Sequence, residues 1–186
     1  MKVLVIGFGS IGKRHYDVLS QLSEVQNIDL VTKQNIENIV CYINLEVIKN
    51  IEEYDYFVIA SETNKHFEQL KFLEENVKNK LIFCEKPLFQ SKKYLEIKNN
   101  KLFIGYVLRF HPLLEKLKEF VKNEKILLVN AKCSQYLPSW RPNTDYKNCY
   151  SAKKDEGGGV LLDLSHEIDY VQWLAGQINE IKSYQV

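Results

Sequence analysis

The residues of this sequence that could bind a ligand begin with three glycines near its start. Gly7, Gly9 and Gly12 follow the apolar run 2–6, and a helical pattern opens at Ser10. The first glycine allows a tight turn, the second lets the backbone approach a pyrophosphate, and the third lets the helix pack closely on the strand. The free N–H groups and the positive dipole end of the helix then face the phosphates. The sequence therefore predicts a dinucleotide site here, with an ordinary strand–turn–helix connection as the alternative.

A second group of polar residues ends the next predicted strand, 28–31. In NAD-specific sites an acidic residue at this point binds the ribose hydroxyls. Here the strand ends in Thr32-Lys33, and Asp29 lies inside the strand, too early for that role. A hydroxyl followed by a cation suits a 2′-phosphate better, which predicts a preference for NADP over NAD. The alternative is that Lys33 is a solvated surface residue.

Two further polar turns follow the apolar runs 56–60 and 81–84. Ser61 to His66 comes after the first run, and Glu85-Lys86-Pro87 comes after the second. Ligands of open α/β sheets lie at the carboxyl ends of the strands, so both turns should border the cofactor. A proline cannot continue the sheet, and it could be cis. Lys86 would then face the nicotinamide. The alternatives are an ordinary strand-ending turn and a capping or surface histidine.

A glycine run at 157–159 leads into a predicted helix that continues to 174 and stops at Gly176. Asp163 and His166 are three residues apart, so both would face one side of this helix, and Asp169 would continue the stripe. The alternative is a capping aspartate and a packed histidine.

Between these groups lies an aromatic, proline-punctuated loop over 136–146. Its aromatic residues with polar tips lie beside arginine and aspartate, a combination that suits a sugar or sugar-nucleotide pocket. Only 3 of the 25 basic residues are arginines, Arg14, Arg109 and Arg141. An arginine in this lysine-rich background suggests a position where a planar, bidentate guanidinium is needed. The alternative is a structured surface loop.

The periodicity of apolar residues predicts the elements that position these groups. The first helix should span 10–22, with Val18, Leu19 and Leu22 on its inner face. Asn44 should cap a helix over residues 45–51. Further strands are predicted over 39–43, 102–106, 126–135 and 178–186, and further helices from 66 to 73 and from 113 to 120. The fold class is therefore α/β, with a Rossmann doubly wound parallel sheet in residues 1–118 and a partial α+β substrate domain in residues 119–186.

Composition excludes several classes of partner. The formal net charge of the 186 residues is +1, which indicates no nucleic-acid partner, and no apolar run approaches the roughly 20 residues of a membrane span. The chain enters a predicted strand at once, so we expect no signal peptide. The four cysteines show no metal-binding spacing, which predicts reduced thiols, no metal and a cytoplasmic location.

Taken together, the glycine turn, residues 61–66, Glu85-Lys86-Pro87, and Gly105-Tyr106 with Arg109-Phe110 resemble the Gfo/Idh/MocA family. These are NAD(P)-dependent relatives of glucose–fructose oxidoreductase and inositol dehydrogenase. The glycine-rich helix that carries Asp163 and His166 resembles the family pattern too, although many relatives have one more residue between the two. The resemblance covers the whole chain, and a complete relative continues further.

The resemblance implies hydride transfer between NAD or NADP and a carbinol carbon of a sugar, sugar nucleotide or cyclitol. Lys86 would bind the reacting oxygen, His166 would exchange its proton, and Asp163 would orient His166 or bind a neighbouring hydroxyl. The predicted cofactor-binding residues are Gly7, Gly9, Ser10, Ile11, Gly12, Thr32, Lys33, Ser61, His66, Glu85, Lys86 and Pro87. The predicted substrate-binding residues are Lys86, Arg109, Tyr136, Trp140, Arg141, Asp163 and His166.

Two other functions remain open. Some relatives are NAD-dependent glycosidases, and a short chain could also be a truncated, non-catalytic cofactor-binding protein. We further expect a homo-oligomer, because the two predicted strands over 126–135 and 178–186 would leave an uncovered sheet face and edge.

Overall fold

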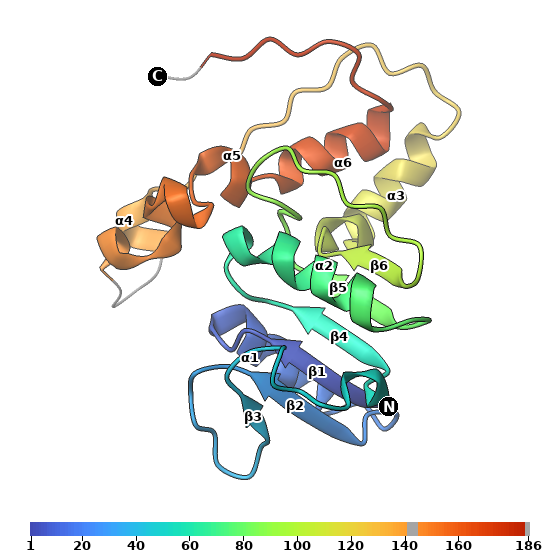
Figure 1. Ribbon diagram of the computed structural model, residues 1–186. Helices are drawn as coiled ribbons and strands as arrows, with labels where there is room; N and C mark the ends of the chain where they lie inside the picture. The colour runs from blue at the N-terminus through green and yellow to red at the C-terminus, as the bar shows by residue number, and fades with distance from the viewer. Residues whose placement is uncertain (141–144, 185–186) are drawn as a thin grey trace.

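The fold is built around one parallel sheet. In the computed structural model, which describes residues 1–140 and 145–184, six strands pair in the order β3-β2-β1-β4-β5-β6 (Figure 1). Their bounds are β1 (Lys2–Ile6), β2 (Asn27–Val31), β3 (Cys41–Tyr42), β4 (Tyr56–Ile59), β5 (Leu81–Cys84) and β6 (Lys101–Ile104). This confirms the predicted Rossmann sheet, with β3 shorter than the predicted strand over 39–43.

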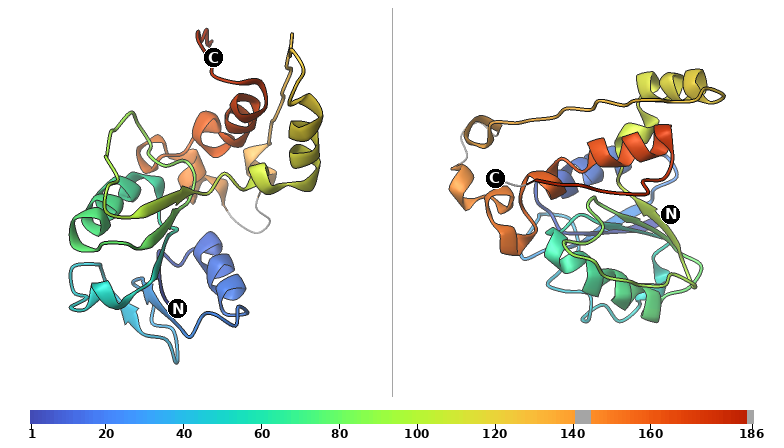
Figure 2. Two further views of the ribbon diagram at one scale, coloured as in Figure 1. Left: turned by 90° about the vertical axis from the view of Figure 1, so that its right-hand side faces the viewer. Right: turned by 90° about the horizontal axis from the view of Figure 1, so that it is seen from above.

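The central strand is apolar on both faces. Leu4 and Ile6 of β1 belong to one buried cluster, and Val3 and Val5 belong to the other, because successive side chains of a strand point to opposite faces. All four are at most 1% exposed. Helices α1 (Ser10–Leu19) and α2 (His66–Asn76) cover opposite faces of the sheet (Figure 2). Each such buried side chain contributes about 1.5–3 kcal/mol to folding.

Helix α1 is shorter than predicted, and its inner face is narrower. The helix ends at Leu19, which is 8% exposed, whereas Val18 is 55% and Leu22 is 44% exposed. Val18 points about 100° away from Leu19 around a helix, and Leu22 lies beyond the helix end. The predicted inner face over Val18, Leu19 and Leu22 is therefore wrong except at Leu19.

The helix predicted over 45–51 does not form. The Oδ1 atom of Asn44 accepts the backbone N–H of Val47 at 3.2 Å, as a cap would, but no helix follows in residues 44–50. A single 3-10 turn, η1 (Ile51–Glu53), comes after them. Leu45, Ile48 and Ile51 are nevertheless buried, so the turns serve the same packing as the predicted helix.

The second half of the described chain is helical and irregular. Its helices are α3 (Pro112–Val121), α4 (Leu137–Trp140), α5 (Val160–Asp163) and α6 (His166–Ala175), and α3 packs against α6 (Figure 1). Its 3-10 turns are η3 (Val107–Phe110), η4 (Tyr146–Asn148), η5 (Tyr150–Ala152) and η6 (Lys154–Glu156). One further 3-10 turn, η2 (Thr63–Lys65), lies in the first half and precedes α2. No helix of the described residues is long and apolar enough to span a membrane.

The helix predicted over 160–174 is broken in two. Helix α5 ends at Asp163, and Leu164 leaves the helical conformation with φ −104° and ψ 31°. Helix α6 begins at His166 and is stopped by Gly176, which has φ +100°. The stop at Gly176 is confirmed, but Asp163 and His166 do not share the face of one continuous helix.

The two strands predicted in the C-terminal half are wrong for the residues that the structure describes. Residues 125–136 and 177–184 contain no strand. Most of their apolar side chains are exposed, Leu127 and Leu128 by 85% each and Ile181 by 76%. A strand needs a partner to satisfy its backbone N–H and C=O groups. Neither apolar segment finds one, so an apolar sequence alone does not produce a sheet.

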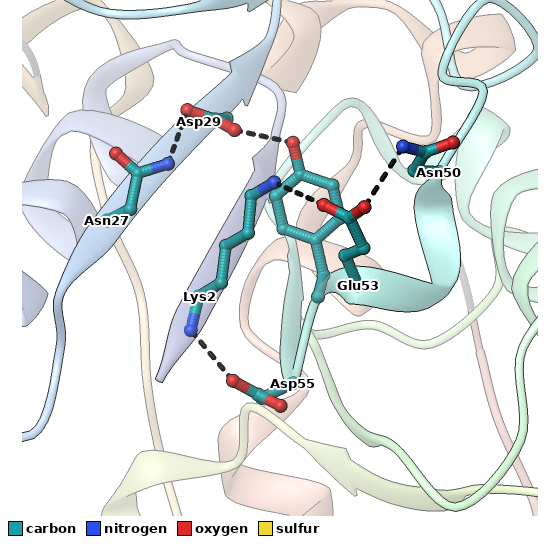
Figure 3. Close-up of polar contacts among 7 residues, drawn as sticks. Lys2, Asn27, Asp29, Asn50, Glu53 and Asp55 are labelled. Carbon is teal, nitrogen blue, oxygen red and sulfur yellow. Dashed lines mark hydrogen bonds and ion pairs between the residues drawn. The ribbon is translucent and has the colours of Figure 1, made fainter.

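Polar contacts join strands β1 and β2 to the residues that precede β4 (Figure 3). The carboxylate of Asp29 accepts the hydroxyl of Tyr54 at 2.6 Å and the side-chain amide of Asn27 at 2.8 Å. The backbone N–H of Lys2 donates to Asp55 at 2.8 Å. Burial, followed by the bond to Asp29, raises the pKa of Tyr54. Asp29 is 3% exposed and has this structural role inside β2, where the sequence placed it.

A buried carboxylate on α2 holds the turn that precedes β6. Glu74 is 7% exposed, and its oxygens accept the backbone N–H groups of Lys98 at 2.7 Å and Asn99 at 2.6 Å and the side-chain amide of Asn100 at 2.8 Å. Burial favours the neutral acid, but these hydrogen bonds outweigh it and lower the pKa of Glu74. The carboxylate therefore stabilises the fold in its charged form.

We predict that Glu74→Gln lowers the free energy of unfolding at pH 7 by about 1–3 kcal/mol. A lowered folded-state pKa means that the contribution is present above the unfolded pKa of about 4.3 and is lost as pH falls through the folded pKa. The difference between wild type and variant, measured by urea unfolding, should therefore shrink below pH 4. Glu75→Gln is the control, because Glu75 is 60% exposed and makes one 3.9 Å ion pair with Lys71.

Candidate functional site

Two of the three glycines in the first turn are required by packing. Gly7 has φ +94°, and a Cβ atom on it would lie 2.6 Å from the backbone nitrogen of Ser61. A Cβ atom on Gly12 would lie 2.1 Å from the carbonyl oxygen of Gly7. The turn therefore folds tightly against the end of β4, and neither position accepts a side chain without movement of the backbone.

The third glycine is surrounded by open space. Gly9 is the N-cap of α1, and no atom lies within 4 Å of the position that its Cβ would take. No side chain caps this end of the helix, and Ser10 and Ile11 of the first turn are exposed. A glycine that packing does not require, at an uncapped helix N-terminus, fits the close approach of a phosphate.

The turn after β2 lies beside this glycine turn. The side-chain amide of Gln34 donates to the carbonyl oxygen of Phe8 at 3.0 Å, and the hydroxyl of Thr32 accepts the backbone N–H of Gln34 at 3.1 Å. Lys33 is exposed. Sequence reasoning missed Gln34, whose link to Phe8 holds Thr32 and Lys33 at the edge of the glycine turn.

His66 braces two loops at the carboxyl ends of β4 and β5. It is 1% exposed, with Nε2 3.1 Å from the carbonyl oxygen of Ser61 and Nδ1 3.2 Å from that of Pro87. The hydroxyl of Ser61 donates to Gln69 at 2.6 Å. The ring is therefore enclosed between the two loops, in contrast to the capping or surface histidine considered from sequence.

A second histidine, which sequence reasoning missed, holds the carboxylate of Glu85. The Nε2 atom of His15 on α1 lies 2.7 Å from Oε1 of Glu85, and the side chains are 23% and 14% exposed. The ring of His15 also packs edge-on against Phe83, at 5.1 Å between centroids. His15 lies three residues after Gly12, on the helix face that packs against the sheet, and this spacing was the available signal.

The side chain of Lys86 crosses to the second half of the chain. Its ammonium donates to the carbonyl oxygen of Asp163 at 2.6 Å, and the Lys86–Pro87 peptide bond is cis, as the sequence allowed. Burial lowers the pKa of Lys86, and the carboxylates of Asp163, Glu85 and Glu167 partly offset this effect. Asp163 itself is 7% exposed.

His166, the first residue of α6, lies in the electrostatic field of Lys86. Burial and then the charge of Lys86 lower the pKa of His166, whereas Glu167, Glu85 and Asp169 raise it. Its ring packs edge-on against Tyr106, with 5.8 Å between centroids. Its Nδ1 atom is buried and has no hydrogen-bond partner among the described residues. An imidazole kept neutral beside an ammonium can accept a proton.

The remaining predicted substrate residues are placed differently. The guanidinium of Arg109 is bound by Asp169 in a bidentate ion pair, at 2.8 and 2.6 Å. Tyr136 is 73% exposed, and Trp140 ends the short helix α4. Arg141 lies outside the described residues. The structure therefore brings Lys86, Asp163 and His166 together, with Arg109 one helical turn from His166 through its partner Asp169.

Known proteins match both halves of the chain. Residues 1–101 match a family model, GFO_IDH_MocA, described as an oxidoreductase family with an NAD-binding Rossmann fold. Residues 118–185 match the model described as the C-terminal alpha/beta domain of the same oxidoreductase family. In the described part of the chain, no cluster of His, Cys, Asp or Glu side chains could hold a metal ion.

One curated relative is similar in sequence, and two solved structures share the fold. An uncharacterized oxidoreductase of Streptococcus pneumoniae is 26% identical over 147 residues, which are 74% of this chain and 38% of the relative. The WlbA dehydrogenase of Bordetella pertussis, solved with NADH and UDP-GlcNAcA, has a TM-score of 0.72 at 17% identity, over 94% of this chain and 58% of that one. The transcriptional regulator Gal80p of Kluyveromyces lactis has a TM-score of 0.68 at 17% identity. The match covers 94% of this chain and 51% of that one. The chain thus spans 38–58% of the length of these proteins.

A substitution in the glycine turn can weaken cofactor binding without lowering the stability of the fold. We predict that Gly9→Val weakens binding of NAD(P) by at least about tenfold, or 1.4 kcal/mol. Its side chain would occupy the open space at the helix N-terminus, and calorimetry measures the affinity. The thermal midpoint should stay close to that of the wild type, because no atom lies within 4 Å of the position that the new Cβ would take.

Gly12→Ala is the matched control for this prediction. Its Cβ would lie 2.1 Å from the carbonyl of Gly7, so this variant should lose stability, by about 1–3 kcal/mol or more. A Gly9→Val protein with unchanged cofactor affinity would contradict the assignment of the dinucleotide site.

Proposed function

The chain belongs to the Gfo/Idh/MocA oxidoreductase family, and on this basis we propose that it serves hydride transfer between NAD(P) and a carbinol carbon of a sugar-like substrate. The observation that carries the proposal is the meeting of Lys86 with Asp163 and His166. These residues come from the end of β5, from α5 and from α6. The ammonium of Lys86 then lies close enough to His166 to lower the pKa of its imidazole, near the predicted nicotinamide end of the cofactor.

The described residues fit a dinucleotide. Gly9 leaves room at the N-terminus of α1, and the turn at Thr32 and Lys33 lies beside it. The cofactor would extend from there toward Glu85 and Lys86, along the carboxyl ends of the strands. A bound NAD(P) would supply the hydride acceptor for oxidation of an alcohol or the hydride donor for the reverse reaction.

Each protein group has a distinct role in this proposal. The Nζ atom of Lys86 donates a hydrogen bond to the reacting oxygen and stabilises negative charge on it. The imidazole of His166 accepts the hydroxyl proton during oxidation and returns it during reduction. Asp163 orients these two groups, since its carbonyl oxygen already holds the ammonium of Lys86. Partial burial of Lys86 strengthens each of these interactions.

The substrate class rests on a structural neighbour and on the predicted aromatic loop. The Bordetella WlbA structure contains UDP-GlcNAcA, a nucleotide sugar. In this chain, Tyr136 and Trp140 precede Arg141 in a loop that would offer aromatic faces and polar tips to a sugar. We therefore include a sugar, sugar nucleotide or cyclitol in the proposal. Tyr136, Trp140 and Arg141 remain its predicted ligands.

A non-catalytic cofactor-binding protein is the second candidate. The similarity in fold to Gal80p, which is described as a transcriptional regulator, favours it. Net reduction of added NAD(P) by the chain with a sugar substrate supports the oxidoreductase. Tight cofactor binding without turnover across a panel of sugars and nucleotide sugars supports the second candidate. Release of a sugar without net cofactor turnover would indicate the glycosidase.

The expected homo-oligomer stays a prediction with a weaker basis. The described residues do not form the C-terminal sheet that was expected to mediate it, although Leu127, Leu128 and Ile181 are exposed. Light scattering at micromolar concentration measures the assembly directly.

We predict that His166→Asn and Lys86→Met each reduce turnover by about 10²–10⁴-fold, the usual contribution of a general acid–base group. Cofactor affinity should change little, because neither substitution touches the glycine turn. Steady-state kinetics and calorimetry on the same preparations separate the two effects. A variant that keeps nearly full turnover removes its residue from the mechanism.

The pH dependence follows from the lowered pKa of His166. Its neutral, proton-accepting form should persist below the usual histidine pKa of about 6.5, so the acid limb of the oxidation rate should lie below that pH. Lys86→Met removes a cation that favours neutral imidazole, so the pKa of His166 should rise in this variant. An NMR titration of the histidine ring measures both values, and an unchanged pKa in Lys86→Met would contradict the coupling.

The cofactor preference depends on Lys33. One charge-assisted contact to a 2′-phosphate contributes roughly 1.5–3 kcal/mol. We therefore predict that NADP binds about tenfold to a hundredfold more tightly than NAD, and that Lys33→Ala abolishes this preference. Equal affinities in the wild type, or a preference that survives the substitution, would exclude the NADP assignment.

A further inference from the structure

Helix α6 docks on the Rossmann half through an unusual face. None of its ten residues is fully buried, and Val171, Trp173 and Leu174 are only half-buried, so no deeply buried apolar side chain fixes its rotation. Its contacts instead involve His166, Asp169 and Trp173, which are spaced i, i+3 and i+7 and therefore lie on one face. The orientation of His166 depends on these polar and aromatic contacts.

The three contacts reach two neighbouring elements. The ring of His166 packs against Tyr106, which precedes η3, and Asp169 binds Arg109 within η3. At the far end, the ammonium of Lys118 on α3 contacts both the carbonyl oxygen and the ring of Trp173. One face of α6 is thus attached to the segment that follows β6.

Of these three contacts, the ion pair between Arg109 and Asp169 restricts the orientation of α6 most. Nε and Nη2 of Arg109 donate separately to the two carboxylate oxygens at 2.8 and 2.6 Å, and the side chain of Asp169 is only 9% exposed. Two parallel bonds between planar groups fix both distance and orientation. The ammonium of Lys118 is a point charge on a flexible stem, and a single edge-on ring contact contributes only about 0.5–1.5 kcal/mol.

We propose that Arg109 is a positioning residue, whose bidentate ion pair with Asp169 sets the rotation of α6 that holds His166 beside Lys86. This inference rests on the proposed function for its catalytic consequence. It assigns Arg109 a role different from the substrate contact expected from the sequence, because two of its donors are already bound by Asp169.

The test uses NMR of the histidine side chains in the whole chain, which contains four histidines. The edge-on contact with Tyr106 places the ring of His166 in an aromatic environment, so its resonances report displacement of α6. Arg109→Gln should shift the His166 signals and leave those of His15 and His66 in place. Arg109→Lys should shift them too, because lysine keeps the charge but cannot form both bonds.

Further variants make the interaction specific. Asp169→Asn should produce the same shift, and Arg109→Gln should add little in the Asp169→Asn background, as expected for a shared interaction. The matched control is Glu53→Gln, which breaks the exposed ion pair between Lys2 and Glu53 at 3.2 Å and should leave His166 unchanged. If Arg109→Gln fails to fold, Arg109→Lys and Asp169→Asn carry the test.

Activity supplies a second measurement. Misplacement of a reacting group by about 1 Å can cost 10²-fold in rate, so turnover should fall by about that factor while cofactor affinity stays unchanged. Unmoved His166 signals in folded Arg109 variants overturn the proposal. Unmoved signals with a raised KM and unchanged kcat do so as well, and they support direct substrate binding by Arg109.

The proposed activity can fail without overturning the positioning role of Arg109. If Gly9→Val leaves cofactor binding intact, or if the chain shows no turnover, the proposed activity fails. The histidine signals of the ligand-free protein still show whether Arg109 positions His166.

Discussion

The parallel pairing of β1, β4 and β5 is the constraint on which the candidate site depends. In this register Ile6 lies opposite Ile59, and Ile59 lies opposite Cys84, so the three strands end level with one another. The glycine turn, the loop from Ser61 and the Glu85-Lys86-Pro87 turn therefore leave the sheet side by side. The register is fixed by burial, because a slip of one residue would reverse the faces of strands that are packed on both sides.

Level strand ends do not by themselves hold the loops that follow, and histidines supply part of this support. His15 reaches Glu85 from α1, and His66 joins Ser61 to Pro87 from α2, so the tripeptide around Lys86 is attached to helices on both faces of the sheet. His166 approaches from α6. Three of the four histidines thus surround one short turn, which places a partly buried ammonium in a defined position.

The two halves of the chain are stabilised by different interactions. The strands of the Rossmann half form two continuous apolar clusters with α1 and α2. Helix α6 has no buried residue and is attached by an ion pair, a ring contact and a lysine. Polar attachment is directional but weaker than burial of a core. The proposed reaction therefore combines a rigid cofactor domain with a catalytic histidine whose placement depends on a few polar contacts.

The sequence by itself determined the Rossmann fold, the glycine turn and the strand ends, because these follow from local patterns: apolar runs, glycine spacing and a charged turn with proline. It missed His15, Gln34 and the bond between Arg109 and Asp169, which join residues 70, 26 and 60 positions apart in the chain. It also predicted strands over 126–135 and 178–186 and one helix over 160–174. Only the tertiary structure decided these points. An apolar segment becomes a strand only when a partner satisfies its backbone, and the continuity of a helix at Leu164 depends on how the residues on either side of it pack.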